Sequence, residues 1–121
     1  MERIFFIIGA FSAFVSVAAG AYGSHGLKGK LSAEMLSVFE IGVRYQMYHA
    51  LGLIAVSFAS VQWPGKLMLS AGCLFIVGSL LFSGTIYLYC LTGTKWFGPL
   101  TPIGGALLMA GWLSLAVGAM K

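Results

Sequence analysis

The residues of this chain that could carry acid–base chemistry gather in one short stretch. Glu40 and Arg44 stand four positions apart with the acid first, which is the favourable order for an ion pair on a helix. The most polar part of a long uncharged run follows them directly, Tyr45-Gln46-Met47-Tyr48-His49. Together with His25 these polar positions form the predicted polar cluster: His25, Glu40, Arg44, Tyr45, Gln46, Tyr48 and His49. Its two candidate roles are a structural lock and a proton relay through Glu40, Tyr48 and His49.

The two histidines also raise metal or haem ligation as a minor alternative. His25 lies near the end of the first apolar run and His49 near the start of the second, so a hairpin is expected to place both on the same membrane side, with Glu40 nearby. The residues and motifs that other kinds of catalysis need are absent from the sequence. The sequence has no aspartate and no Cys-x-x-Cys, His-Glu-x-x-His, Walker or Gly-x-Ser-x-Gly motif. We therefore expect no enzyme activity, no resident cofactor and no metal site.

The cysteines do not favour redox chemistry either. Cys73 and Cys90 fall in one apolar run, and on one helix they would stand about 25 Å apart. That distance is far beyond disulfide reach, so both are interpreted as apolar filler.

The composition indicates that the segments carrying these residues are surrounded by lipid and not by water. The chain has 121 residues, 60% hydrophobic and only 8% charged, whereas soluble domains carry about 25% charge. Four runs contain no charged residue, each longer than the roughly 20 residues that a membrane-spanning helix needs: 4–27, 45–65, 67–94 and 96–120. The runs do not alternate as barrel strands do. The sequence predicts one domain, 1–121, an all-α membrane four-helix bundle with spans at about 4–23, 45–62, 67–90 and 102–120.

Local signals place the ends of these helices. Pro64-Gly65 predicts a tight turn, Gly93 a helix stop, and Thr101-Pro102 an N-cap followed by a first-turn proline. Ser32 is the predicted N-cap of a helix that begins before the second span. Residues 33–44 then form either a separate interfacial segment or a headgroup-level extension of that span. A cleaved signal peptide is the alternative for the first run, but signal cores are only about 7–15 residues long.

Small residues at helical spacing predict how the helices pack. Side chains of this size let helices approach closely in lipid. The predicted packing positions are Gly9, Ser12, Ser16, Gly20, Ser79, Ser83, Gly84, Gly104, Gly105, Ala110, Ser114 and Gly118. Their main expected role is to hold the bundle together, and one leftover face is available for a homo-oligomer or another membrane protein.

The positive charges are too evenly spread to decide orientation. Arg3, Lys66 and Lys121 are predicted on one side, with Lys28, Lys30, Arg44 and Lys95 on the other. The net charge of +4 suits anionic lipid headgroups and is too diffuse for nucleic acid.

Several stretches resemble the uncharacterised domain of unknown function 423 family, which includes vertebrate transmembrane protein 256 relatives. The matching segments are 23–27, 39–51, 82–87, 91–93, 101–105 and 111–112, which run along the chain in order. Ser24 is a mild departure from the glycine or alanine expected there. The resemblance implies a bacterial inner-membrane protein with about four helices, and it implies no reaction.

The sequence therefore predicts a non-catalytic membrane protein, an accessory or interaction subunit, in which the polar cluster locks the first hairpin. A small proton-coupled transporter or channel using Glu40, Arg44 and His49 is the alternative. If the cluster is structural, Arg44→Ala or Glu40→Ala is expected to lower the melting temperature in detergent, because the pair is expected to be semi-buried and stranding one partner is costly.

Overall fold

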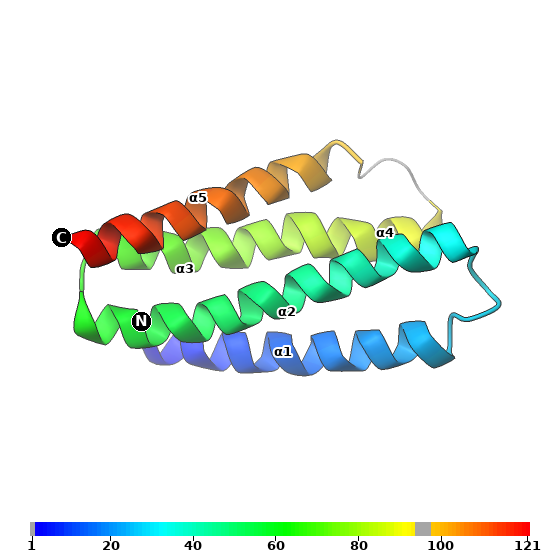
Figure 1. Cartoon of the computed structure of the whole chain (residues 1–121), viewed down its shortest axis with the longest axis horizontal. Helices are drawn as coiled ribbons and strands as arrows, with labels where there is room; N and C mark the ends of the chain where they lie inside the picture. The colour runs from blue at the N-terminus through cyan, green and yellow to red at the C-terminus, as the bar shows by residue number, and fades with distance from the viewer. Residues whose placement is uncertain (1, 94–97) are drawn as a thin grey trace.

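Four helical rods pack lengthwise in the computed structural model, which describes residues 2–93 and 98–121 (Figure 1). The elements are α1 (Glu2–His25), α2 (Ala33–Gln62), α3 (Lys66–Ser79), the π-helix η1 (Leu80–Gly84), α4 (Thr85–Thr92) and α5 (Leu100–Met120). α3, η1 and α4 follow one another without a break and form the third rod. The predicted all-α four-helix bundle is confirmed.

Most predicted helix ends are where the sequence signals place them. Ser32 caps α2 by accepting a hydrogen bond from the Met35 amide at 3.1 Å, and Gly93 ends α4 in the left-handed conformation with φ 73°. The Thr101 cap was predicted wrongly, because α5 already begins at Leu100, directly after Pro99. Proline fixes φ near the helical value, so Pro99 starts the helix and leaves the Thr101 hydroxyl for another use. The predictions on Lys95, Trp96 and Phe97 lie outside the described residues.

α2 is the central element of the bundle. It runs as one continuous helix from Ala33 to Gln62, so residues 33–44 are its first part and not a separate interfacial segment. It packs against every other rod, whereas α1 packs mainly on α2, and α5 mainly on α3. The side chains of α2 therefore determine what the interior of the bundle contains.

The third rod contains a feature that the sequence did not predict. Between Leu80 and Gly84 the helix widens to a π-helix, and it returns to α-helix at Thr85. The Thr85 hydroxyl donates to the Leu81 carbonyl at 2.5 Å, a bond back to the preceding turn that often accompanies helix distortion. Short π-helices inside α-helices frequently mark functional sites.

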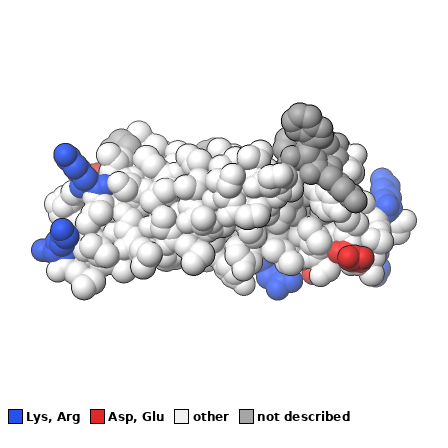
Figure 2. Space-filling model, turned by 90° about the horizontal axis from the view of Figure 1, so that it is seen from above, with Lys and Arg blue, Asp and Glu red and all other residues white. Residues whose placement is uncertain are grey.

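Three of the rods have the length and apolar content of membrane spans: α1, the third rod (Lys66–Thr92) and α5. Only 17% of the most apolar window of α1 is buried, so most of its apolar side chains face outward, as lipid contact requires. On the face seen in Figure 2, Lys and Arg lie at the left end and in the right-hand part of the molecule, and the long stretch between them shows no charged residue. α2 is long enough to cross, but the polar side chains after Arg44 lower its hydropathy.

The glycines and serines predicted as packing positions fall into two groups. Gly9, Ser16, Ser83 and Gly104 are buried, and Gly118 packs on Met68. Ala110, in contrast, is exposed. The prediction failed there because a strict four-residue step drifts around a helix of 3.6 residues per turn. The face of α5 that packs on α3 follows mixed steps of three and four instead, through Gly104, Leu108, Gly111 and Ser114.

Gly104 and its neighbour Gly105 offer a matched pair for testing this packing. A β-carbon at Gly104 would lie 2.5 Å from the Phe82 backbone nitrogen and 2.9 Å from the Gly78 carbonyl oxygen, and backbone cannot move aside cheaply. We expect Gly104→Ala to lower the free energy of unfolding, measured by denaturant titration in mixed micelles, by about 1–3 kcal/mol. A β-carbon at Gly105 would lie 3.6 Å from the Phe82 ring, an ordinary contact. Gly105→Ala should therefore be neutral or stabilising, and equal losses for the two variants would contradict this packing.

Candidate functional site

Gln46 is the centre of a hydrogen-bonded network inside the bundle. Its Nε2 donates to the Ser12 carbonyl oxygen at 3.0 Å and lies 3.3 Å from the Ser12 hydroxyl, on α1. Its Oε1 accepts from the Tyr87 hydroxyl, on α4, at 2.5 Å. One amide side chain on α2 therefore connects three rods, and its donor and acceptor ends are both used.

Four serines connect neighbouring helices in the same way, each donating its hydroxyl to a backbone carbonyl oxygen across an interface. Ser16 donates from α1 to Val43 at 2.8 Å, and Ser57 donates back from α2 to Glu2 at 2.6 Å. From the other two rods, Ser83 donates to Gly42 at 2.6 Å and Ser114 to Leu67 at 2.7 Å. A helical carbonyl can accept a second hydrogen bond, so each serine is satisfied without breaking the neighbouring helix.

His49 lies where α2, α3 and α5 meet, and its side chain is paired on both nitrogens. The Trp112 indole N–H donates to His49 Nε2 at 2.9 Å, and Nδ1 lies 2.6 Å from the Tyr45 carbonyl oxygen. An acceptor nitrogen carries no proton, so Nδ1 must hold the proton and donate to Tyr45. Phe75 packs against both rings, with centroids 5.3 Å from His49 and 4.7 Å from Trp112. This geometry holds His49 as a neutral imidazole.

Glu40 and Arg44 lie apart from this interior. Their side chains approach to 3.8 Å, as the i,i+4 spacing predicts, but they are 64% and 60% exposed. The expectation of a semi-buried pair was therefore wrong. Tyr48 is exposed as well, and Tyr45 is half exposed with its ring stacked on Phe82. The predicted polar cluster thus divides into a buried part, Gln46 and His49, and an outward-facing part.

His25 is separate from both parts. It ends α1 and is exposed, whereas Gln46, one turn before His49, bonds to Ser12. Ser12 precedes His25 by 13 positions, which is about 20 Å along the helix axis. The possible ligand set of His25 and His49 does not form, because α2 starts beyond the end of α1 and His49 lies halfway along α2. Both ligands of one ion must lie about 2 Å from it, so this pair cannot share a metal.

The sequence analysis missed three pairings: Trp112 with His49, Tyr87 with Gln46, and Thr85 with Thr101. Trp112 and Tyr87 each carry an aromatic ring with one polar atom, and an indole N–H or phenol in apolar surroundings usually needs a partner. That requirement was the available signal, but it does not say which partner. Thr85 and Thr101, whose hydroxyl oxygens lie 2.6 Å apart, join α4 to the start of α5.

A groove opens between α1 and the third rod on the outer surface of the bundle. It has a volume of about 460 Å³, and it is walled by apolar side chains such as Phe11, Val15 and Leu80. Gln46 and Tyr87 form its floor, and Ser79 and Gly84 of the third rod line its other side. No charged residue is among its lining residues. Neutral, apolar occupants are the ones that such a groove accommodates.

Among the described residues, no three His, Cys, Asp or Glu side chains are grouped so that they could hold a metal ion. Cys73 and Cys90 are free thiols, one exposed and one buried. The interior polar groups are hydrogen-bonded, and the middle of the bundle carries no charged residue among those described. These features define a class: a small helical membrane protein whose buried polar side chains bond to other groups of the same chain.

The comparisons with known proteins identify the family. The sequence profile described as "Protein of unknown function (DUF423)" matches residues 19–105. The chain is 43% identical to the UPF0382 membrane protein SSP2132 of Staphylococcus saprophyticus, over 98% of both chains. It is 40% identical to the UPF0382 membrane protein YwdK of Bacillus subtilis, again over 98% of both. This chain therefore belongs to the DUF423 family of uncharacterised membrane proteins. No solved structure matches it.

The Gln46 network predicts a specific effect of removing one hydroxyl. Tyr87→Phe keeps the ring but leaves Gln46 Oε1 without its donor. We expect the free energy of unfolding in mixed micelles to fall by about 1 kcal/mol, the cost of stranding a buried acceptor. Tyr48→Phe is the control, because that ring is exposed. A loss no larger for Tyr87→Phe than for Tyr48→Phe would show that the network adds no stability.

The exposed ion pair predicts the opposite outcome. Arg44→Ala and Glu40→Ala should each change the free energy of unfolding by less than about 0.5 kcal/mol, since exposed i,i+4 pairs contribute little. The Glu40→Ala/Arg44→Ala double variant completes the cycle and isolates the pair itself. A coupling energy well above this value would mean that the pair is shielded from water in the bilayer.

Proposed function

We propose that this chain is a non-catalytic, multi-pass protein of the bacterial cytoplasmic membrane that acts as an accessory or interaction subunit. The observation that supports the proposal is the closed hydrogen bonding of its interior. Of the polar side chains buried in the described structure, each pairs with another group of the same chain. Such an interior stabilises a shape, and the outer surface is what remains available to a partner.

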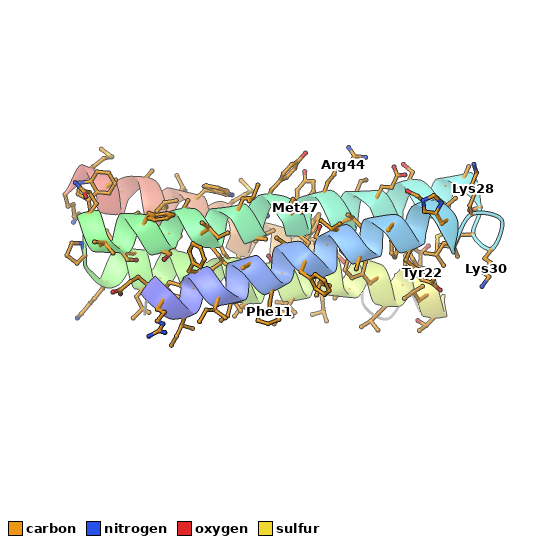
Figure 3. All side chains as sticks on the ribbon, turned by 90° about the horizontal axis from the view of Figure 1, so that it is seen from below. Phe11, Tyr22, Lys28, Lys30, Arg44 and Met47 are labelled. Atoms are coloured by element: carbon orange, nitrogen blue, oxygen red, sulfur yellow. The ribbon has the colours of Figure 1, made fainter. Side chains whose placement is uncertain are left out.

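The placement of charges supports four crossings, with α2 as the fourth. One level is set by Arg3, Lys66 and Lys121, which lie at the start of α1, the start of α3 and the end of α5. The other level is set by Arg44, labelled in Figure 3, near which Gly42 packs on Ile86 and Tyr87. From Lys66 to Tyr87 the third rod rises about 30 Å, which matches the thickness of the hydrocarbon core. Among the described residues, none between these levels is charged. The first turns of α2 then extend about 16 Å past Arg44 into the headgroup layer and beyond.

The same placement argues against a proton relay through Glu40, Tyr48 and His49. Glu40 lies nine residues before His49 on α2, about 13 Å along the axis. Tyr48 points outward and does not bridge them, while His49 has both nitrogens engaged. A relay needs successive partners within hydrogen-bond reach, and the described side chains provide no such succession.

Two measurements on the full-length protein test the proposal. Reconstituted in liposomes with a trapped pH-sensitive dye, it should conduct protons no faster than protein-free liposomes do, and Glu40→Gln should behave identically. Tagged protein extracted from native membranes with a mild detergent should retain a membrane-protein partner, a second copy included, in stoichiometric amount. A tagged unrelated four-helix membrane protein is the control. Glu40-dependent proton flux by a chain that purifies alone would establish the transporter alternative instead.

A further inference from the structure

One glycine of the bundle has no explanation within the chain. Among the glycines inside described helices, Gly84 alone has no atom within 4 Å of where a β-carbon would stand. Its backbone is ordinary, with φ −60° and ψ −44°, so no strain requires a glycine. Glycine costs a helix about 1 kcal/mol relative to alanine. A position with this cost and no internal contact is typical of a surface that another backbone approaches closely.

Ser79 stands one turn before Gly84 on the same groove, and it is unpaired in the described structure. Four other serines each donate to a carbonyl oxygen of a neighbouring helix at 2.6–2.8 Å. Ser60 and Ser70 also make no such bond, but they lie within about two turns of Lys66, near the headgroup layer. Ser79 lies about 20 Å from Lys66 along the third rod, well inside the proposed hydrocarbon layer, where a lone hydroxyl is costly.

Ser79 and Gly84 therefore repeat the device with which this chain joins its own helices. Ser83 donates to the carbonyl of Gly42, and Ser114 donates to Leu67 beside Gly118, where a β-carbon would lie 3.2 Å from the Leu67 side chain. In each case a hydroxyl forms the bond and a glycine permits the close approach. We infer that the groove between α1 and the third rod is a helix-docking interface, and that its occupant is a second copy of this chain.

Self-complementarity favours a second copy over another protein. The groove is bordered by two protruding side chains, Phe11 on α1 and Leu80 on η1, which are 68% and 66% exposed. One face thus carries both the ridge and the groove, which is what a two-fold contact requires. Membrane insertion gives both copies the same orientation, so equal depths meet. Figure 3 shows Phe11 at the opposite edge of the bundle from Arg44, so the ion pair stays outside the contact.

This inference deepens the proposed function and rests on it, since it names a second copy as the partner. Its first test compares two enlarged side chains. Gly84→Leu adds bulk to the docking surface at a position where a β-carbon would have no atom of its own chain within 4 Å, whereas Ala106→Leu enlarges an exposed residue on α5 outside the groove. Fluorescently labelled chains in phosphatidylethanolamine–phosphatidylglycerol vesicles are counted by photobleaching over a range of protein-to-lipid ratios.

The wild type and Ala106→Leu should dimerise equally, whereas Gly84→Leu should raise the dimer dissociation constant at least about tenfold. Ser79→Ala should raise it about threefold, the typical effect of one hydrogen bond between membrane helices. Circular dichroism should show unchanged helix content and thermal stability for Gly84→Leu. A monomeric wild type, or equal dimerisation of all variants, would overturn the interface.

Cysteine cross-linking in native membranes provides the second readout. In a Cys73→Ser, Cys90→Ala background, Leu80→Cys should form an oxidised dimer of twice the 12.8 kDa chain, and Ala106→Cys should not. A Leu80→Cys adduct with a different protein would overturn the second copy as occupant while leaving the interaction-subunit proposal intact. Absence of both the dimer and any co-purified partner would instead contradict the proposed function itself.

Discussion

The structure depends on one constraint: a polar group inside lipid has no water to bind and must find its partner within protein. This chain meets the constraint with uncharged pairs, in which serine, threonine, tyrosine, glutamine, histidine and tryptophan side chains bond to one another or to helix carbonyls. Each of these pairs joins one helix to another, and bonds within a helix, such as that from His49 Nδ1 to the Tyr45 carbonyl, satisfy the remaining polar atoms. The hydrogen bonds that satisfy the interior are therefore the ones that align the rods.

α2 carries this arrangement because it is both the most polar and the most central rod. A helix with Gln46 and His49 at mid-height would be costly against lipid on all sides. Surrounded by the other three rods, it turns those residues to Ser12, Tyr87 and Trp112. The polar stretch that suggests chemistry in the sequence thus becomes the contact that holds α1, the third rod and α5 around α2.

The π-helix of the third rod shows how local distortion and assembly are connected. It widens the helix at Leu80–Gly84, directly after Ser79, and within it Ser83 reaches inward to Gly42. Gly84 is left with open space on the groove side. One short segment therefore bonds inward to α2 and presents a small, close-approach surface outward, which is why the interface with a second copy is proposed there.

The sequence by itself determined that lipid surrounds the helices, that the fold is all-α, and where most helices end, because hydropathy and capping act over a few neighbouring residues. Uncharged runs predicted the rods, and Ser32, Pro64-Gly65 and Gly93 predicted their ends. Only the tertiary structure decided which polar residues meet. It separated His25 from His49, left Glu40 and Arg44 exposed, and paired His49 with Trp112, 63 positions away. Such pairings follow from the offset and rotation of whole helices against each other, which no short stretch of residues specifies.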